Sequence, residues 1–162
     1  MPLTIRPLDP DSPGARALVA LSDAYLAARY PPESNHLETI EALRRPNVRL
    51  LGAWVDETLV GCGAVKILDD SQVRYGEVKR LFVIEAQRGR GHSTLIMAQL
   101  EAHLRAARVP LVRLETGIRQ PEALGLYRRL GYRERGPFGP YRTDPWSVFM
   151  EKRLEAGPGQ PA

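Results

Sequence analysis

The stretch from residue 75 to residue 115 constrains the fold more than any other part of the sequence. An apolar run at residues 75–84 predicts a strand, residues 92–108 carry apolar side chains at helical spacing, and residues 111–115 predict another strand. A strand, a crossover helix and a second strand of the same sheet form a right-handed unit with parallel strands. We therefore expect parallel strands in part of the sheet.

The rest of the chain predicts hairpins rather than further crossovers. Residues 48–55 and 59–67 flank Asp56-Glu57-Thr58, which is typical of two antiparallel strands. The other expected elements are a strand at 3–8, helices at 15–29, 38–44 and 121–130, a strand from Tyr132 and a strand at 147–152. This order, β-α-α-β-β-β-α-β-α-β-β, predicts one α/β (α+β) domain with a mixed sheet over residues 1–154, and it argues against a Rossmann fold. Residues 155–162 (EAGPGQPA) are expected to form a disordered tail.

Composition excludes some classes of function. The chain has 162 residues and a net charge of +4, which fits an anionic small ligand, and it lacks the long basic run expected of a nucleic-acid-binding protein. Cys62 is the only cysteine, so no intrachain disulfide forms, and a reducing, cytoplasmic location is expected. No membrane span is expected, because no window reaches 18 apolar residues, and no metal is expected, because no Cys/His cluster has ligand spacing.

The turn QRGRGHSTL, residues 87–95, joins a predicted strand to a predicted helix. The first N–H groups of a helix have no partner within it, and the helix dipole places about half a positive charge there. Glycines let the backbone approach an anion closely, and arginines add charge and paired donors. The turn therefore predicts a phosphate or pyrophosphate site, although a simple connection between strand and helix stays open at this point.

Two nucleotide-binding patterns do not fit this turn. A Walker motif needs lysine after its last glycine, whereas His92 follows Gly91. A dinucleotide motif needs a further glycine, and none follows Gly91 within ten residues. Glu115, at the end of the next strand, could take the place of that motif's acidic residue, but position alone is weak support.

Two segments resemble the GNAT superfamily of acetyl-CoA-dependent acyltransferases. GEVKRLFVIEAQRGRGHSTLIMAQLEAHL resembles motif A, in which Gln or Arg, two residues, Gly, one residue and Gly or Ala match Arg88, Gly91 and Ser93. Ser93 departs from the usual glycine or alanine but is small. ALGLYRRLGY resembles the helix ending in Tyr-x-x-x-Gly-Phe/Tyr, with Tyr127 at the tyrosine position. The resemblance covers about residues 6–154. YPPESNH, GCGAVK, GEVKR and FGPY are similar to a bacterial group of small GNAT proteins, which narrows the fold and not the substrate.

The resemblance implies a GNAT fold, in which a mixed, largely antiparallel sheet is flanked by helices and splayed between its fourth and fifth strands. It implies acetyl-CoA as cofactor, with the pantetheine arm on the exposed edge of the fourth strand. A backbone N–H near Phe82 or Val83 would polarise the thioester carbonyl. The residues that it places around the cofactor are Leu81, Phe82, Val83, Arg88, Gly89, Arg90, Gly91, His92, Ser93, Gln120 and Tyr127.

Tyr127 and Glu77 are the catalytic residues that the resemblance implies. A phenol with a pKa of about 10 can protonate a thiolate whose thiol has a pKa of about 8.5, so Tyr127 is the expected general acid. Burial in the core is the alternative role for this tyrosine. Glu77 is the expected general base, since in several GNAT proteins a glutamate of this strand has that role. A salt bridge is the alternative for Glu77, and Glu33 and His36 are rival candidates for the base.

Two loops are expected to face the acceptor. Residues 30–36 contain Glu33, Asn35 and His36, which could read an amine or a carboxylate, although ordinary helix capping there stays open. Residues 136–146 contain Arg142, which would suit an acceptor with a carboxylate, and packing of the loop on its own aromatic side chains is the alternative.

The sequence thus predicts an N-acetyltransferase that transfers acetyl from acetyl-CoA directly to a small primary amine, such as an amino acid or a polyamine, in a ternary complex. The alternatives are a peptide or protein N-terminal or lysine acetyltransferase, and a catalytically silent acyl-CoA-binding module. A homodimer is an assembly state to expect, because many GNAT proteins dimerise. Neither nucleic acid nor membrane is an expected partner.

Overall fold

The computed structural model describes residues 2–155 of the chain. Its elements follow the predicted order and are β1 Leu3–Pro7, α1 Pro13–Ala27, α2 Ile40–Leu43, β2 Val48–Val55, β3 Thr58–Asp69, β4 Arg74–Val83, α3 His92–Ala106, β5 Leu111–Gly117, α4 Pro121–Arg129, β6 Arg133–Arg135 and β7 Ser147–Arg153. Two 3-10 turns, Pro32–Ser34 and Glu85–Gln87, add to them. The predicted tail lies outside the described residues from residue 156 on.

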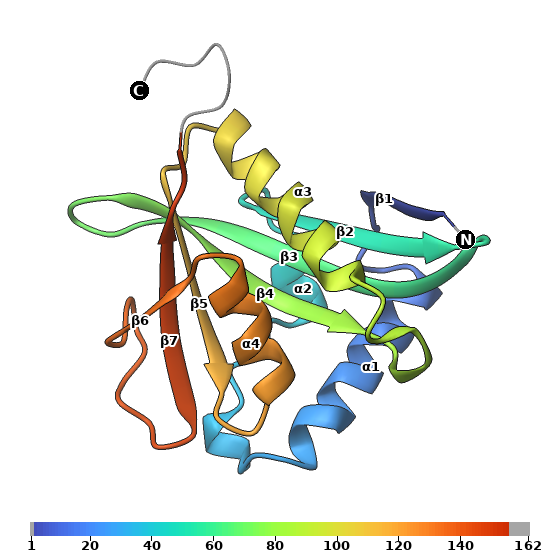
Figure 1. Ribbon diagram of the computed structural model, residues 1–162, viewed down its shortest axis with the longest axis horizontal. Helices are drawn as coiled ribbons and strands as arrows, with labels where there is room; N and C mark the ends of the chain where they lie inside the picture. Colours follow the sequence, from blue (N-terminus) through green and yellow to red (C-terminus); the bar gives the residue numbers. More distant parts are fainter. Residues whose placement is uncertain (1, 156–162) are drawn as a thin grey trace.

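Seven strands form one sheet in the order β1-β2-β3-β4-β5-β7-β6 (Figure 1). Every neighbouring pair is antiparallel except β4 and β5, which are parallel because α3 carries the chain across the sheet between them. The predicted mixed, largely antiparallel sheet is confirmed, and β4 with β5 is its parallel pair.

The parallel pairing is short. Only Tyr75, Gly76 and Glu77 of β4 pair with β5, opposite Leu111, Val112 and Arg113. Both strands continue beyond these residues without pairing to each other, as the diverging arrows of β4 and β5 show (Figure 1). The predicted splay is confirmed, and the divergence leaves an unpaired edge on each strand.

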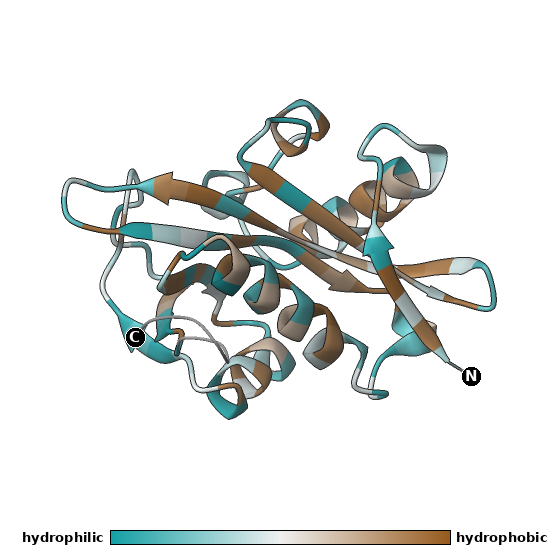
Figure 2. Cartoon of the chain, turned by 90° about the horizontal axis from the view of Figure 1, so that it is seen from above, coloured by the Kyte–Doolittle hydropathy of each residue, from teal (hydrophilic) through white to brown (hydrophobic). Residues whose placement is uncertain are grey.

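Helices cover both faces of the sheet (Figure 2). On one face α3 and α4 bury Ile96, Leu100, Leu104 and Leu126 against the sheet. On the other face Ala15 and Leu18 of α1 and Leu43 of α2 pack on Leu50, Cys62 and Ala64. Successive strand residues point to opposite faces, so Leu51 and Val65 belong to the first cluster while their neighbours Leu50 and Ala64 belong to the second.

The connection between α1 and β2 differs most from the sequence-based prediction. The helix expected at residues 38–44 is reduced to Ile40–Leu43, with Thr39 Oγ1 accepting the Ala42 N–H as its N-cap. Glu38 lies outside this helix, since its carbonyl accepts from Arg80 and its carboxylate pairs with Lys66. Residues 30–38 consequently form a strap, mostly without regular structure, over the diverging strands. No helix within residues 2–155 is long and apolar enough to span a membrane.

Candidate active site

The glycine turn before α3 is open to a ligand. Gly89 and Gly91 have φ angles of 76° and 80°, the left-handed region that favours glycine. A Cβ placed at either residue would meet no atom within 4 Å, so the backbone there is uncovered. Gly91 is the N-cap of α3 and no side chain caps the helix, which leaves its first N–H groups available to an anion. This geometry fits the pyrophosphate of acetyl-CoA.

Some side chains around the turn are hydrogen-bonded within the protein, and others are exposed or carry an atom without a hydrogen-bond partner in the described residues. Arg88 donates from Nε to the Val83 carbonyl at 2.9 Å, and its guanidinium lies 4.9 Å from the centre of the Tyr25 ring. Arg90 is exposed, and Ser93 is half-buried in the first turn of α3. The His92 ring is hydrogen-bonded through Nε2 to Gln87 at 3.0 Å, whereas its Nδ1 is buried and has no partner within residues 2–155.

A bulge in β4 reorients the strand edge next to the splay. Cys62 and Ala64 of β3 face Phe82 and Lys79, so Arg80 and Leu81 together oppose the single residue Gly63. Arg80 takes the left-handed φ of 56°. Its buried guanidinium anchors this conformation, pairing with Asp23 at 2.5 Å and donating to the Glu38 carbonyl at 2.9 Å.

Beyond the bulge, one set of backbone groups faces the gap between β4 and β5. The Ile84 N–H donates to Val60 of β3, so alternation turns the backbone groups of Val83 away from β3. The Val83 carbonyl accepts from Arg88, in agreement with this direction. Among the three residues predicted to lie along the pantetheine arm, Leu81 lines the pocket and Val83 offers its backbone to the open edge. The Phe82 ring packs edge-on against Tyr25, 6.2 Å between ring centres.

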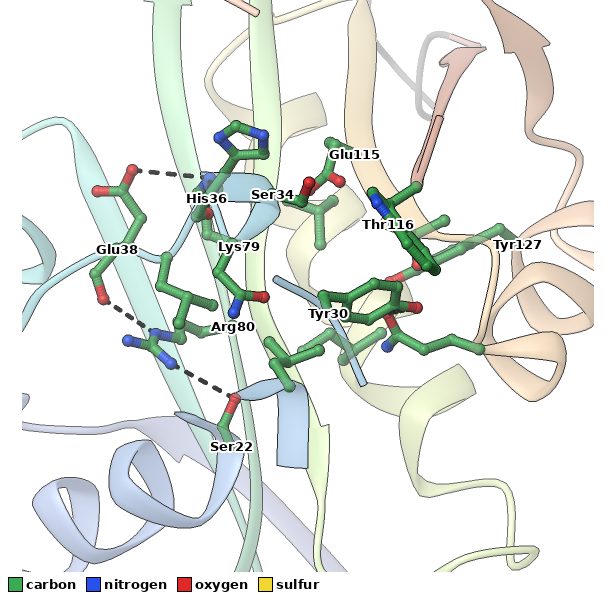
Figure 3. Close-up of a pocket in the computed structure, with 18 residues that line it drawn as sticks. Ser22, Tyr30, Ser34, His36, Glu38, Lys79, Arg80, Glu115, Thr116 and Tyr127 are labelled. Atoms are coloured by element: carbon green, nitrogen blue, oxygen red, sulfur yellow. Dashed lines mark hydrogen bonds and ion pairs between the residues drawn. The ribbon is translucent and has the colours of Figure 1, made fainter. Parts of the chain in front are cut away.

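A pocket of about 100 Å³ lies where the two strands diverge. Its walls come from α1, β4, the end of β5, Gln120 and Tyr127 at α4, the strap at residues 30–38 and Trp146. Figure 3 shows Glu38, Lys79 and Arg80 on one side of this pocket and Glu115, Thr116 and Tyr127 on the other. A volume of this size suits an acetyl group and a reacting amine, not a whole acetyl-CoA molecule.

Tyr127 projects from α4 into this pocket and is largely buried. Burial, and then the nearby Glu115 carboxylate, raise the pKa of its phenol, so the hydroxyl keeps its proton at neutral pH. No hydrogen bond within residues 2–155 engages this hydroxyl. Gln120, at the N-cap position of α4, accepts from the Tyr30 hydroxyl at 3.1 Å and also lines the pocket.

Glu115, near the end of β5, lines the pocket although it was not among the site residues predicted from the sequence. Burial raises the pKa of its carboxyl from the ordinary 4.5 to about 7, even though Ser147 Oγ donates a hydrogen bond of 2.8 Å to it and Lys79 lies nearby. The sequence does contain one signal for it. Ligand crevices in α/β sheets lie at the carboxyl ends of strands beside a topological switch, and Glu115 is at such an end.

Glu77 belongs to a network that joins three segments of the chain. Its carboxylate accepts from the Tyr141 hydroxyl at 2.5 Å and lies 3.5 Å from Lys79 Nζ. Lys79 donates to Tyr141 at 2.8 Å and to the His36 carbonyl at 2.9 Å, and the His36 and Tyr141 rings pack at right angles. Glu77 is 5% exposed and does not line the pocket, so its observed contacts are those of the salt-bridge alternative.

The acceptor side contains some of the predicted residues and lacks others. Asn35 and His36 line the pocket, together with the buried Ser34. Glu33 and Arg142 are exposed and lie outside the pocket lining, because the 3-10 turn at Pro32–Ser34 and the loop before Trp146 direct other residues inward. No group of three or more His, Cys, Asp and Glu residues within residues 2–155 is arranged to hold a metal ion.

A sheet splayed beside an open glycine turn, with a tyrosine and a glutamate at the point of divergence, defines an acyltransferase site of the kind that uses acyl-CoA. Residues 15–132 match the Acetyltransferase (GNAT) family, and the chain belongs to this family. The family and the enzyme class implied by the sequence are thereby confirmed, and acetyl-CoA is the cofactor of the family. The expected homodimer stays a prediction.

Individual relatives agree with this assignment. A protein of Azospirillum brasilense named IAA acetyltransferase is 45% identical over 147 residues, which cover 89% of this chain and 95% of that protein. A solved structure from Klebsiella pneumoniae, named as an acyl-CoA N-acyltransferase, has 35% identity and a TM-score of 0.77, covering 94% of this chain and 98% of the other. The PaiA N-acetyltransferase of Thermoplasma acidophilum, solved with coenzyme A, has 20% identity and a TM-score of 0.69 over 95% of this chain and all of that one, a likeness of fold.

Proposed function

We propose that the protein transfers the acetyl group of acetyl-CoA directly to a small primary amine held in the pocket between β4 and β5. The observation that carries this proposal is that Glu115 and Tyr127, a carboxyl with a pKa of about 7 and a protonated phenol, line the same small pocket. A base and an acid on one reacting centre are what amine acetylation requires.

Glu115 is proposed as the general base instead of Glu77. An ammonium group has a pKa of about 10 and must lose a proton before it attacks. A carboxylate with a pKa of about 7 accepts this proton better than one at the ordinary 4.5 and is still ionised in half or more of the molecules at neutral pH and above. Glu77 is engaged by Tyr141 and Lys79, so it would have to break both contacts to reach an amine.

Tyr127 is proposed as the general acid. Acetyl-CoA, when bound, supplies a thioester whose C–S bond breaks as the new C–N bond forms. Tyr127 gives its proton to the departing sulfur, and the proton lost by the amide nitrogen restores the phenol. Glu115 passes the first proton of the ammonium to solvent, so the products are an amide, a neutral thiol and one released proton.

The backbone of β4 is proposed to hold and polarise the thioester. The N–H of Val83 faces the gap and could donate to the carbonyl oxygen, an oxyanion-type role. The glycine turn, with Arg88, Arg90, His92 and Ser93, would hold the pyrophosphate, and Gln120 would lie beside the acyl end. Arg88 would have to release the Val83 carbonyl for the pantetheine arm to pair there.

Direct transfer is favoured over an acyl-enzyme at a cysteine. Cys62 is the only cysteine of the chain and is 2% exposed. Burial raises the pKa of its thiol to about 12, which leaves almost no thiolate at neutral pH. The acceptor pocket is also roofed by the strap, which supports a small amine over a peptide end or a protein lysine.

Release of free thiol from acetyl-CoA, followed with a thiol reagent across a panel of primary amines, tests the function. The expected result is amine-dependent release that is lost in Glu115→Gln and strongly reduced in Tyr127→Phe. Acetyl-CoA binding measured by calorimetry, without release for any amine or peptide, would instead identify a catalytically silent binding module.

A further inference from the structure

Most charged side chains that line the acceptor pocket form ion pairs with other residues of the described chain, and one does not. Four Asp, Glu, Lys or Arg side chains line it, namely Glu38, Lys79, Arg80 and Glu115. Glu38 pairs with Lys66 and Lys79, and Arg80 pairs with Asp23. Within residues 2–155, Glu115 is the one member of this set outside any ion pair. The two cations in the wall, Lys79 and Arg80, are therefore already committed to carboxylates and carbonyls of the protein.

A second carboxylate, Asp144, is not in the pocket lining but is hydrogen-bonded to two residues of that lining. Asp144 accepts hydrogen bonds of 2.8 Å from the Trp146 N–H and from Ser34 Oγ, and it forms no ion pair within the described chain. These hydrogen bonds lower the pKa of its carboxyl, so it is ionised at neutral pH. Through Ser34 of the strap and through Trp146, whose ring packs against Tyr30, it is joined to the pocket lining.

Ser147 connects the two acidic residues through one backbone and one side-chain hydrogen bond. Ser147 donates its N–H to the Asp144 carbonyl and its hydroxyl to Glu115. Burial is the main reason that the pKa of Glu115 is raised, and the charge of Asp144 adds a smaller part, so the two carboxylates interact electrostatically. When Glu115 is ionised, it and Asp144 present two negative charges that form no ion pair within residues 2–155, and Lys79 offsets part of the charge at Glu115.

From this arrangement we propose that the acceptor is a primary amine without a carboxylate, which enters as its ammonium ion, and that Asp144 is a specificity-determining residue. The inference rests on the proposed function and names the acceptor class for the same site. An ammonium group gains from both carboxylates, whereas the carboxylate of an amino acid would lie against them without a counter-charge. Amino acids, which the sequence allowed as acceptors, are thereby disfavoured.

One cation near the pocket, Arg119, could favour an acceptor that has a carboxylate. The experiment therefore includes a variant of this residue. The exposed Arg119 guanidinium lies 4.4 Å from the centre of the Trp146 ring and donates to the Arg29 carbonyl at 3.3 Å. It has no carboxylate partner within residues 2–155. It does not line the pocket, so it would reach only a carboxylate that stays at the outer side of Trp146.

Matched acceptors that differ by one carboxylate test the inference. We would measure thiol release from acetyl-CoA with phenethylamine against phenylalanine, and with agmatine against arginine, at fixed pH. Phenylalaninamide serves as the control for size, since it keeps the bulk of phenylalanine without its charge. The expected kcat/KM is at least about tenfold higher for each amine than for its amino acid, the effect of one uncompensated charge.

The variant Asp144→Asn keeps the shape and can still hydrogen-bond to Ser34 and Trp146. It is expected to raise KM for agmatine and phenethylamine and to narrow their advantage over the amino acids, with kcat little changed. Glu134→Gln removes an equal charge on β6, where Glu134 pairs with the exposed Arg128, and should alter none of these values. A uniform loss of activity in Asp144→Asn with all acceptors would mark a structural role and contradict the assignment.

Equal or better use of the amino acids would overturn the inference while leaving the proposed function intact. If Arg119→Ala then abolished the acetylation of amino acids, Arg119 would be the residue that binds the acceptor's carboxylate. Absence of thiol release with every acceptor would count against the proposed function itself, so the two failures are distinguishable.

Discussion

Glu115 and Glu77 are both carboxylates near the splay, but they differ in their hydrogen bonds and ion pairs. Glu77 has a short hydrogen bond from Tyr141 and a lysine at 3.5 Å. Glu115 has one hydroxyl donor, no ion pair within the described residues and a raised pKa. Two contacts fix Glu77 in place, whereas burial raises the pKa of Glu115 to about 7, so that Glu115 can exchange a proton near neutral pH.

The activity of the enzyme is therefore expected to depend on the ionisation of Glu115. A general base works only when deprotonated, so kcat/KM should rise with pH through about 7, the pKa of this carboxyl. Burial is the largest cause of this raised pKa; the Ser147 hydrogen bond and the Lys79 charge lower the pKa, and the charges of Glu77 and Asp144 raise it. A pH–rate profile checks the prediction, and Glu115→Gln should lose this limb. If kcat/KM of Glu115→Gln still rose with pH through about 7, the rise would belong to the ionisation of another group.

Glu115 also has a predicted cost in stability. Its folded pKa is raised from 4.5 to about 7, so the folded state binds this proton more tightly than the unfolded state. The ionised form is therefore penalised on folding, by about 3 kcal/mol above pH 7 at about 1.4 kcal/mol per pKa unit, and by nothing below the unfolded pKa. Glu115→Gln should raise the free energy of unfolding at pH 8.5 and change it little near pH 4. Urea denaturation at both pH values measures this, and an equal effect at both would refute the ionisation argument.

The proposed role of Tyr127 as general acid predicts slower turnover without weaker binding of acetyl-CoA. Tyr127→Phe keeps the ring that packs edge-on against Tyr132, 5.8 Å between centres, and removes only the hydroxyl. Loss of a general acid should lower kcat by about 10²–10⁴-fold, with the Kd of acetyl-CoA nearly unchanged. Steady-state kinetics and calorimetry on the same preparation separate the two effects. Unchanged turnover would remove Tyr127 as the acid.

At the scale of elements, the acceptor pocket depends on two loops that are tied to β4. Lys79 and Glu77 hold the strap through the His36 carbonyl and the loop before β7 through the Tyr141 hydroxyl. Ser34 and Asp144 then join strap and loop directly. The walls are thus positioned from a buried strand, and not by the loops alone.

Tyr141→Phe tests this positioning. The variant removes a donor to the buried Glu77 and an acceptor for Lys79, and should lower the free energy of unfolding by about 1–3 kcal/mol. The KM for the amine should rise while the Kd of acetyl-CoA is retained, because the glycine turn is not part of the network. Tyr132→Phe is the matched control, since it removes a buried phenol–carboxylate hydrogen bond to Glu101 outside the acceptor pocket. If both variants raise KM alike, Tyr141 has no special role in the pocket.

The sequence predicted the order of strands and helices, because that order follows from local periodicity. The glycine turn lies between β4 and α3, where the motif placed it, and its binding of the cofactor stays a prediction. The Lys79 network could not be predicted, because its partners lie 43 and 62 residues away along the chain. The raised pKa of Glu115 was equally hidden, since it depends on how much of β5 and β7 covers that carboxyl.

At the scale of the whole molecule, a short junction joins two groups of strands. β1 to β4 form one group and β5, β7 and β6 the other, with only three residues of β4 paired across the junction. Arg113 reinforces this place, pairing with Asp70 at 3.0 Å and with Glu151 at 2.8 Å. Because the larger core cluster contains residues of both groups, we expect them to unfold together.

Arg113→Leu should therefore lower the stability of the entire domain. The loss is expected to be about 1–3 kcal/mol, less than for a fully buried pair because both partner carboxylates are partly exposed. The melting temperature should fall by about 2–4 °C per kcal/mol in a single transition. Arg128→Leu, which breaks an exposed pair, should change it far less. Two separate transitions would show that the groups unfold independently.

The position of Trp146 makes the protein its own optical probe. The chain has two tryptophans, and Trp54 lies on β2 under the Arg6 guanidinium, outside the acceptor pocket. A Trp54→Phe variant would therefore emit only from the indole that forms part of the pocket wall, between Tyr30 and Arg119. Acceptor binding could then be titrated by fluorescence without any label, even for an amine that is never acetylated.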